Sequence, residues 1–280
     1  MIYITLTGGL GNQMFQYAYG LALASRHGVP FRLDLTRLED HTEPRPGFTP
    51  RRYSLDCFQC PFPIASRDEL SRFRTKWGWR ISRFNSLLIR LGLRPVGHVL
   101  LDGYWQDHTL FKRVVGQLRE HFRFQPLRTP AAIEWVREIQ IGKPSICVHV
   151  RRGDYSGNML HEVCTPGYYR DAVDHLWEKT GGFATIFVFS DNIDWCRQHL
   201  HFSQEVRFIS SDLAQDETLH LMSLCDHYVI SNSSFSWWAI WLNRDGTKQV
   251  VSPSRWLNHE PENSALVKGL ILSEWHVINT

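Results

Sequence analysis

Short apolar runs alternate with amphipathic stretches along most of this 280-residue chain, and the alternation predicts strands and helices in turn. In the second half, apolar and β-branched runs predict strands over residues 146–150, 186–190, 206–209, 228–231 and 249–252. Helical patterns between these runs begin at Pro166, Asn192, Gln215 and Phe235. Because alternating strands and helices form a parallel sheet with helices on both faces, this half predicts an α/β fold.

The first half starts with the same alternation. Strands are predicted over 2–6, 31–34 and 99–101, and a helix over 14–27 lies between the first two. An irregular stretch over 38–63 then interrupts the pattern. Turn-forming residues at 141–144 separate this half from the later series of strands and helices, so we expect two domains, 1–140 and 141–280.

The strand predicted at 146–150 ends in a cluster of ionisable side chains. His149 lies near its end, and Arg151, Arg152 and Asp154 follow directly. Ligands of open parallel sheets bind beyond the carboxyl ends of the strands, where these side chains are expected to lie. An arginine fork is always charged and binds two oxygens at once, which favours a diphosphate; a surface salt-bridge cluster is the alternative.

Polar residues also follow two later strands of this sheet. The strand at 186–190 leads into Ser190 and Asp191, whose oxygens can accept from a ribose hydroxyl or a base edge. The strand at 228–231 is followed, at the start of a helix, by Asn232, Ser233, Ser234 and Phe235. One serine is enough to cap a helix, so this longer polar run favours a phosphate at the helix N-terminus.

A glycine-rich loop separates the first strand from the first helix. It contains Gly9, Gly11, Asn12 and Gln13. Glycines let the backbone approach a ligand, and the free N–H groups of the following helix attract an anion. The spacing matches neither the dinucleotide-binding fingerprint nor a phosphate-binding P-loop, and a tight turn without a ligand accounts for this loop equally well.

Taken together, these motifs resemble those of the bacterial α-1,2-fucosyltransferases of glycosyltransferase family 11. The resemblance extends from Ile4 to about Trp275. It rests on GGLGNQMFQ at 8–16, GYWQ at 103–106, HVRRGD at 149–154, SDN at 190–192, SNSSFSWW at 231–238 and PSRW at 253–256. The HxRRxD element is shared with α-1,6- and protein O-fucosyltransferases, so it indicates the donor rather than the linkage.

The resemblance implies a GT-B fold, with two Rossmann-like domains facing across a cleft. Domain 1–140 is then the acceptor side and domain 141–280 binds GDP-fucose, with the C-terminal tail packing back on the first domain. The implied reaction is inverting transfer of L-fucose from GDP-β-L-fucose to a galactoside hydroxyl in α-1,2 linkage, for a bacterial surface glycan such as an O-antigen. Two alternatives are a same-fold glycosyltransferase with another nucleotide sugar and a non-catalytic carbohydrate-binding protein that uses the eleven Trp residues.

The resemblance also suggests roles for the polar clusters. Departure of GDP places negative charge on the β-phosphate, which many transferases meet with a metal held by Asp-x-Asp, a triplet absent from this sequence. We therefore expect no metal requirement and take Arg151 as the compensating cation, with Arg152 bracing the loop, alone or paired with Asp154. Asp154, His149 and a carboxylate of the first half are the candidates for a general base. Asn12 is expected to face the donor across the cleft.

The charge balance and hydropathy narrow the choice of partners. With 31 basic and 28 acidic residues, the chain lacks the positive excess of a nucleic-acid-binding protein. No apolar run approaches twenty residues and a strand pattern starts at Ile2 without a charged leader, so we expect a cytoplasmic protein. The cysteines fit that compartment: Cys147 and Cys225 have positions typical of buried thiols, and Cys57 and Cys60 lack the second pair or the histidine of a zinc set.

The segment 70–95, from Leu70 to Pro95, contains no acidic residue. Its seven basic residues are interleaved with Phe73, Trp77, Trp79 and Phe84. This pattern is typical of an interfacial helix that contacts anionic lipid, which would place the protein peripherally on the inner membrane. A solvated helix whose aromatics pack inward accounts for it equally well. Because bacterial glycan acceptors are often carried on membrane lipids, we expect a galactose-terminated oligosaccharide acceptor, lipid-linked or free.

Overall fold

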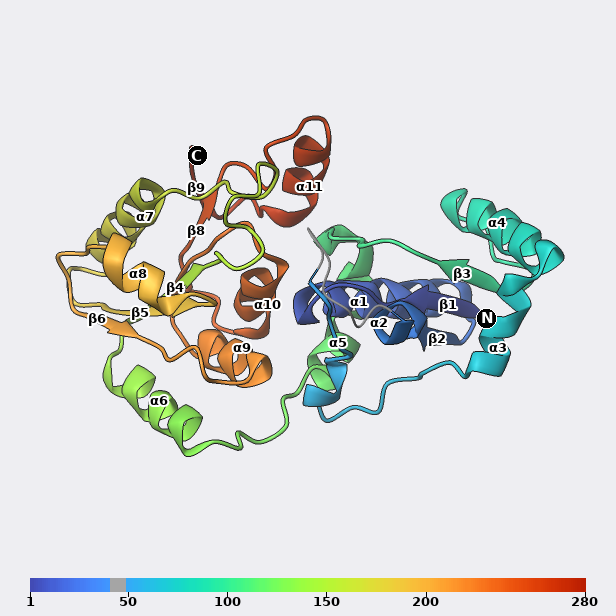
Figure 1. Cartoon of the computed structure of the whole chain (residues 1–280), viewed down its shortest axis with the longest axis horizontal. Coiled ribbons are helices and arrows are strands. Elements are labelled where there is room, and N and C mark those ends of the chain that lie inside the picture. The colour runs from blue at the N-terminus through green and yellow to red at the C-terminus, as the bar shows by residue number, and fades with distance from the viewer. Residues whose placement is uncertain (41–48) are drawn as a thin grey trace. The chain divides into compact units, whose positions relative to one another are not determined.

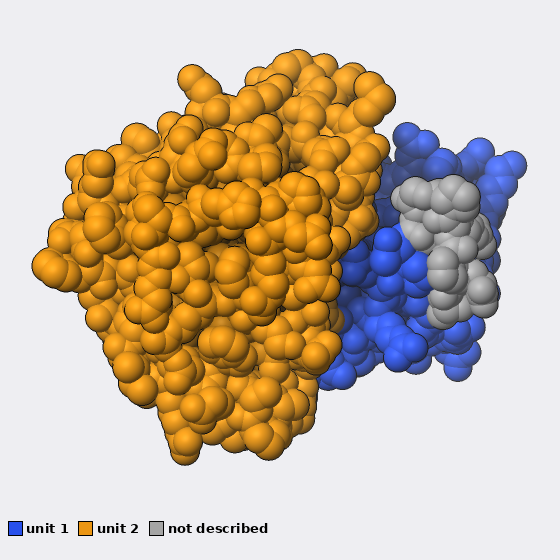
Figure 2. All heavy atoms as spheres, turned by 60° about the vertical axis from the view of Figure 1, so that its left-hand side comes forward, with its two compact units in different colours: residues 1–125 blue, residues 126–280 orange. Residues whose placement is uncertain are grey.

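The computed structural model describes residues 1–40 and 49–280. The described chain forms two compact units, unit 1 (Met1–Gln125) and unit 2 (Pro126–Thr280), which Figure 2 shows in different colours. Each unit is built around a parallel sheet with helices against it, so the predicted α/β class is confirmed. The part of the irregular stretch at 41–48 lies outside the described residues.

Unit 1 contains a three-stranded parallel sheet in the order β2-β1-β3 (Figure 1). β1 (Ile2–Thr5) is an apolar run whose residues are all buried between β2 (Phe31–Asp34) and β3 (Val99–Leu101). Helix α1 (Leu10–His27) contacts β1 and β2 and ends at Gly28. The φ of Gly28 is 61°, a left-handed conformation that glycine adopts without strain, and this explains where the helix stops.

Unit 1 contains further helices, most of them short. They are α2 (Thr36–Asp40), the 3₁₀ turn η1 (Leu55–Cys57), α3 (Arg67–Ser71), η2 (Arg72–Arg74), α4 (Lys76–Arg90), η3 (His108–Val114) and α5 (Val115–His121). Part of the core is aromatic: the Tyr17 ring packs edge-on against Phe62, with 4.7 Å between ring centres, and tilted against Phe122 at 5.7 Å. Edge-on aromatic pairs stabilise a core beyond the area that they bury, so this cluster helps to hold the irregular segments to α1.

Unit 2 contains a six-stranded parallel sheet in the order β6-β5-β4-β7-β8-β9. Its strands are β4 (Ser145–Val150), β5 (Thr185–Ser190), β6 (Val206–Phe208), β7 (His227–Val229), β8 (Val250–Pro253) and β9 (His276–Ile278). Its helices are α6 (Pro130–Ile141), α7 (Pro166–Lys179), α8 (Ile193–His199), α9 (Gln215–Ser223), α10 (Ser234–Leu242) and α11 (Glu262–Leu270). Numbered from β4, this is the strand order 3-2-1-4-5-6 of the Rossmann fold.

Helices cover both faces of the sheet in unit 2. α7 and α8 pack on the face that carries Ile146, Val148 and Val150 of β4, and α6 and α9 lie on the other side (Figure 1). Because neighbouring side chains of a strand point to opposite faces, a strand between two helical layers buries both of its faces and is mainly apolar. This explains why the middle of β4, residues 146–148, is apolar on both faces, while Ser145 and His149 nearer its ends are buried and hydrogen-bonded.

The described elements differ from the predicted ones at their ends. α1 begins four residues before the predicted start at Met14, because Leu10 and Gly11 already lie in its first turn. The boundary expected near Gln140 falls at the end of α6, whereas the division between the two units lies between Gln125 and Pro126. The C-terminal strand β9 was not predicted; it pairs with β8, so the end of the tail belongs to unit 2.

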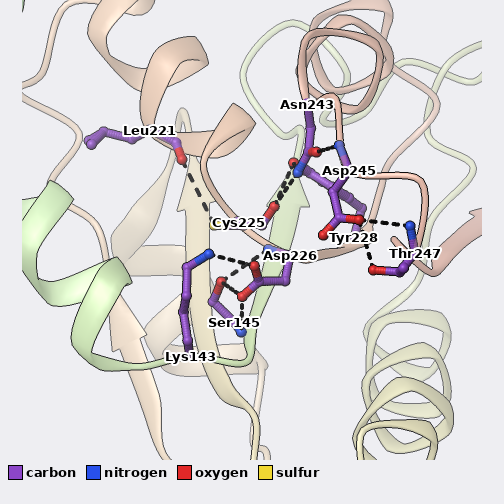
Figure 3. Close-up of polar contacts among 9 residues, drawn as sticks. All are labelled: Lys143, Ser145, Leu221, Cys225, Asp226, Tyr228, Asn243, Asp245 and Thr247. Atoms are coloured by element: carbon purple, nitrogen blue, oxygen red, sulfur yellow. Dashed lines mark hydrogen bonds and ion pairs between the residues drawn. The ribbon is translucent and has the colours of Figure 1, made fainter.

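The amino ends of β4 and β7 are tied together by Asp226. Its carboxylate accepts from the backbone N–H and hydroxyl of Ser145, at 2.9 and 2.8 Å, and from Nζ of Lys143 at 2.7 Å (Figure 3). Burial alone would raise the pKa of Asp226, but these hydrogen bonds outweigh it and hold the pKa below its usual range. The two central strands, β4 and β7, are therefore held together at their amino ends, opposite to the predicted polar loops at their carboxyl ends.

Candidate active site

The carboxyl ends of β4, β5 and β7 bring the three predicted polar loops together. β4 lies between β5 and β7 in the sheet, so the loops that follow these strands are neighbours. The strand order reverses direction between β4 and β7, and ligands of such sheets bind at this switch point. All residues of β4 are buried, which fixes the backbone from which the loop at 151–154 emerges.

Arg151 is held by two carboxylates at this edge of the sheet. Its Nε and Nη2 donate to Oδ1 of Asp154 at 3.0 and 2.6 Å, and its Nη1 lies 2.8 Å from Oδ2 of Asp191. Burial disfavours the charge, but the two carboxylates outweigh it and raise the pKa of Arg151. Among the described residues these contacts engage three of its five N–H groups, so two are left for an anionic ligand.

Asp191 ties the loop after β4 to the end of β5. Besides its ion pair with the guanidinium, it accepts from the backbone N–H groups of Arg152 and Gly153 at 2.8 and 3.1 Å. A Cβ atom on Gly153 would lie 2.6 Å from Oδ2 of Asp191, so only glycine leaves the carboxylate in place. Ser190 accepts from the N–H of Asn192 at 3.0 Å, which helps to turn the chain into α8.

Arg152 belongs to the framework of the same loop. Its Nη1 donates to Glu162 at 2.7 Å and its Nη2 to Ser156 at 2.8 Å, while its guanidinium carbon lies 4.2 Å from the centre of the Trp195 ring. The expected pairing of Arg152 with Asp154 was wrong. Asp154 forms its ion pair with Arg151, and Arg152 forms its ion pair with the carboxylate of Glu162. Glu162 lies ten residues along an irregular loop, where no sequence pattern marks it.

His149 spans the switch point. Its Nδ1 lies 3.0 Å from the hydroxyl of Ser231, which follows β7, and its ring centre lies 5.8 Å from that of Phe235. Burial disfavours the imidazolium and lowers the pKa of His149 to about 4, against the attraction of nearby Asp191. The ring is therefore neutral at neutral pH and bonds to the Ser231 hydroxyl in that form.

One residue of the polar run after β7 caps a helix, and another forms hydrogen bonds to neighbouring loops. Ser233 accepts from the N–H of Phe235 at 3.3 Å and caps α10. The buried amide of Asn232 donates to the carbonyl oxygens of two other loops, at 3.0 and 2.8 Å, which engages both of its N–H groups. Asn232 thus holds the loop in place, and half-buried Ser234 and Phe235 form the first turn of α10.

The glycine loop of unit 1 is shorter than the sequence indicated. Gly8, with a φ of 76°, makes the turn out of β1, and Gly9 is the N-cap residue of α1. A Cβ atom on Gly9 would meet nothing within 4 Å, so the backbone here is open on the side where a side chain would stand. Gly11 is buried in the first turn of the helix, which limits it to a packing role in unit 1.

Two amide side chains follow these glycines with different surroundings. Gln13 is buried and bonds to the backbone of Gly8, Arg52 and Ser54, at 2.9, 2.8 and 2.9 Å, so it holds the neighbouring loops. Asn12 is half-buried, and its Oδ1 accepts from Nε2 of Gln106 at 2.7 Å. Of the predicted residues in this loop, Gly9 and Asn12 are partly exposed, whereas Gly11 and Gln13 are buried.

The segment around Gln106 contains a feature that we did not predict. Trp105 has a φ of 45°, a left-handed conformation that is uncommon for a bulky residue, and its ring stacks on Tyr19 with 4.7 Å between centres. Backbone strain of this kind persists where the surroundings enforce it, and it is frequent at functional sites. Trp105 belongs to the motif GYWQ, but no pattern in the sequence indicates that the backbone is strained next to Gln106, which bonds to Asn12.

The comparisons with known proteins agree with one another. A family model described as "Glycosyl transferase family 11" matches residues 98–279. An alpha-1,2-colitosyltransferase of Escherichia coli is 32% identical over 92% of this chain and 93% of its own length, and the O-antigen biosynthesis glycosyltransferase WbnK of Escherichia coli is 28% identical over 91% and 94%. The galactoside alpha-(1,2)-fucosyltransferase 2 of Oryctolagus cuniculus is 28% identical over 89% of this chain and 69% of its own.

A solved structure has the same fold. NodZ alpha-1,6-fucosyltransferase, co-crystallised with GDP, aligns over 85% of this chain and 91% of its own, with a TM-score of 0.51 and 15% sequence identity. At that identity the likeness concerns the fold alone.

Proposed function

Because the chain belongs to glycosyltransferase family 11, we propose that it transfers L-fucose from GDP-β-L-fucose to the 2-hydroxyl of a galactoside, with inversion at the anomeric carbon. The observation that carries the proposal is Arg151, which Asp154 and Asp191 hold at the switch point of a Rossmann-like sheet. The relatives named for α-1,2 transfer and for O-antigen biosynthesis support the linkage and the glycan class.

The diphosphate of the donor is assigned to the switch point of unit 2. Arg151 offers its two remaining N–H groups to the β-phosphate, and the amino end of α10 adds the partial positive charge of a helix N-terminus. Asp191 already accepts three hydrogen bonds or ion contacts from the loop after β4. We therefore assign it to positioning Arg151 rather than to binding the ribose.

The reaction breaks the bond between the anomeric carbon and the β-phosphate oxygen, and the galactoside oxygen forms the new bond on the opposite face. Negative charge grows on the departing phosphate, so a cation fixed beforehand stabilises the transition state more than the bound donor. Arg151 meets this requirement because its two carboxylate partners hold it in place before the donor arrives.

Two of the three candidates for the general base are engaged in other contacts. The Oδ1 atom of Asp154 already accepts two hydrogen bonds from Arg151, so we assign Asp154 to holding the arginine. His149 is neutral, yet it is only 5% exposed and bonds to Ser231, so we assign it to holding the two loops at the switch point. A carboxylate of unit 1 is then the remaining candidate of the three.

A second donor is favoured by one specific comparison. The relative at 32% identity is named as a colitosyltransferase, and colitose is fucose without its 3-hydroxyl group. The same diphosphate site would serve both GDP-sugars. A site that hydrogen-bonds the 3-hydroxyl would discriminate strongly against the deoxy sugar, whereas an apolar site would not.

A purely carbohydrate-binding function has less support. It was suggested by the number of tryptophans, but Trp237, Trp238 and Trp256 are buried and contribute to the core of unit 2. Core packing accounts for these residues without a ligand. A binding protein would also have no use for an arginine held by two acids at the end of a strand.

We propose that transfer requires no metal ion. Within residues 1–40 and 49–280, no group of three or more His, Cys, Asp or Glu side chains is arranged to hold one, and Arg151 is placed to supply the positive charge. We expect activity to survive EDTA, although divalent ions could still speed the release of GDP. Complete loss on chelation, restored by manganese or magnesium, would overturn this part of the proposal.

The acceptor is proposed to be a galactose-terminated glycan, lipid-linked during synthesis, which the enzyme meets from the cytoplasmic side of the inner membrane. The relative named for O-antigen biosynthesis supports the glycan class, and the lipid carrier is part of our proposal. None of the helices in the described part of the chain has the length and apolar character needed to cross a bilayer. The membrane contact that we propose is peripheral.

The deciding experiment measures GDP release and product formation with GDP-fucose, GDP-colitose, GDP-mannose and UDP-galactose, using lactose as the acceptor. We expect transfer from GDP-fucose, and the NMR spectrum of the product should show an α-1,2 linkage. Higher activity with GDP-colitose would identify the second donor. Activity with UDP-galactose alone, or binding of lactose without transfer from any donor, would refute the proposal. The same assay on Arg151→Ala tests the role of the arginine, and Arg170→Ala, which changes an exposed arginine of α7, is its matched control.

A further inference from the structure

Helix α4 turns an apolar stripe towards solvent. Residues Trp77, Ile81, Phe84, Leu88 and Leu91 recur at intervals of three and four, so they line one side of the helix. Trp77 is 73% exposed, Phe84 is 54% exposed and Leu91 is 65% exposed. Apolar side chains of surface helices normally face the core, so this orientation requires an explanation.

The side of α4 that packs against the rest of unit 1 is largely polar. The hydroxyl of Ser82 accepts from the N–H of Leu100, next to it in β3, at 2.9 Å. Oδ1 of buried Asn85 accepts from the N–H groups of Val96 and Gly97 at 2.8 and 3.1 Å. Two polar side chains thus attach the helix to β3 and the preceding loop, and Figure 1 shows α4 beside β3. Most of the apolar residues of the helix are exposed.

Basic side chains flank the apolar stripe. Lys76, Arg80, Arg83 and Arg90 are exposed on α4, and the segment 70–95 contains no acidic residue. Two arginines lie over exposed indole rings, Arg80 at 5.7 Å from the Trp77 ring centre and Arg83 at 4.8 Å from that of Trp79. Long basic side chains beside an apolar stripe can reach outward to anions while the stripe is buried.

The exposed apolar surface continues beyond the helix. Leu93 is 53% exposed and Val96 is 82% exposed in the turn that connects α4 to β3, and Arg94 lies between them. Helix and turn together form a surface of exposed apolar residues with basic residues among them, which we call the α4 surface (residues 76–96).

We infer that the α4 surface binds an anionic lipid bilayer, with α4 lying in the plane of the headgroups and its apolar stripe inserted among the acyl chains. Helices of this composition bury their apolar side to a depth of about 5–10 Å, and anionic headgroups attract the flanking cations. The inference deepens the proposed peripheral location, but vesicle binding can be measured whether or not the transferase proposal is correct.

Charge complementarity distinguishes a bilayer from a second copy of the chain. A symmetric dimer through the α4 surface would bring two identical sets of cations together without an acid in either segment to compensate them. Anionic headgroups supply the missing charge over an extended area. The uninterrupted apolar stripe also matches an acyl environment, which offers no hydrogen-bonding partners.

The test is co-sedimentation of the full chain with vesicles of phosphatidylcholine alone and with added phosphatidylglycerol. We expect binding to the anionic vesicles only, and roughly a hundredfold lower partition coefficient when Arg80, Arg83 and Arg90 are all changed to Gln. Trp77→Ser with Phe84→Ser should also lower the partition coefficient at least about tenfold. Phe183→Ser, which removes an 81% exposed aromatic residue of unit 2, should leave it unchanged.

Transfer to lactose, measured for all variants, shows whether they remain folded and separates this inference from the proposed function. We expect these rates to stay within about twofold of the original, since the changes lie outside the candidate site. Equal binding to neutral and anionic vesicles, or no binding to either, would overturn the inference. So would light scattering that shows a dimer of the original chain dissociated by Trp77→Ser with Phe84→Ser.

Discussion

Arg151 and Asp191 join the ends of two neighbouring strands, with Nη1 of the arginine 2.8 Å from Oδ2 of the aspartate. The same carboxylate accepts from the backbone N–H groups of Arg152 and Gly153. One side chain at the end of β5 therefore sets both the path of the loop after β4 and the direction of the guanidinium. The geometry of this site depends on the pairing of β4 with β5 as much as on the arginine itself.

Changing Arg151 to Lys is expected to reduce turnover far more than donor affinity. Lysine keeps the charge but cannot reach Asp154, Asp191 and a phosphate together, so the cation loses its fixed position. We expect turnover to fall roughly a hundredfold or more, the scale for losing one preorganised donor. Arg152→Lys should reduce turnover less, because the guanidinium of Arg152 contacts Glu162, Ser156 and Trp195 of the protein itself.

Rate measurements and GDP titrations on both variants check this assignment. If Arg152→Lys abolished turnover while Arg151→Lys kept nearly all of it, the roles of the two arginines would have to be exchanged.

Changing Gly153 to Ala should disturb the site without unfolding the chain. The new Cβ would lie 2.6 Å from Oδ2 of Asp191, so the carboxylate must move away from Arg151. We expect turnover to fall about tenfold or more, as for other losses of a group that orients a catalytic residue. Gly246→Ala is the control, since a Cβ there meets nothing within 4 Å and its turnover should be unchanged. Equal rates for the two variants would show that Asp191 does not position the arginine.

His149 should make the folded state less stable in mild acid. Unfolded, this histidine takes up a proton as the pH falls below 6.5, whereas the folded ring stays neutral down to about 4. The unfolded state thus binds more protons in this window, so the free energy of unfolding falls as the pH falls and levels off above 6.5. Between pH 7 and pH 5 the loss due to His149 is about 2 kcal/mol at most.

Urea unfolding at pH 7 and pH 5 measures this loss. The difference between the two pH values should be smaller in His149→Gln than in the original chain, while the exposed His201→Gln should leave it unchanged. An identical difference in all three proteins would contradict the lowered pKa.

Asp226→Asn should cost stability and spare catalysis. The variant loses the ion pair with Lys143 and leaves one of the two bonds from Ser145 poorly satisfied at the amino ends of β4 and β7 (Figure 3). We expect the free energy of unfolding to fall by about 1–3 kcal/mol, with turnover nearly unchanged because the site lies at the opposite edge of the sheet. Exposed Asp245→Asn should cost less. A strong loss of turnover at full stability would argue against this separation.

The sequence alone was sufficient to predict the parallel sheet of unit 2 and most of the polar residues at the carboxyl ends of its strands. The strands β4, β5 and β7 are short apolar runs, and such runs between helices leave few other arrangements. It did not indicate β9, whose three residues are largely exposed at the edge of the sheet and carry no hydrophobic pattern. It also missed the start of α1, because glycine and asparagine are poor helix formers that here occupy the first turn.

Partners within the site were decided by the tertiary structure. Asp154 and Glu162 both lie within ten residues of Arg152, and only the path of the loop determines that Glu162 is its partner. Asn232 and Gln13 have the composition of ligand-binding residues, yet the fold uses their amides to bond to the backbone of other loops. Likewise, the sequence shows that α4 is amphipathic, but only its attachment through Ser82 and Asn85 turns the apolar stripe outward. Local patterns record which residues can bond, whereas the choice among possible partners depends on distances between segments far apart in the chain.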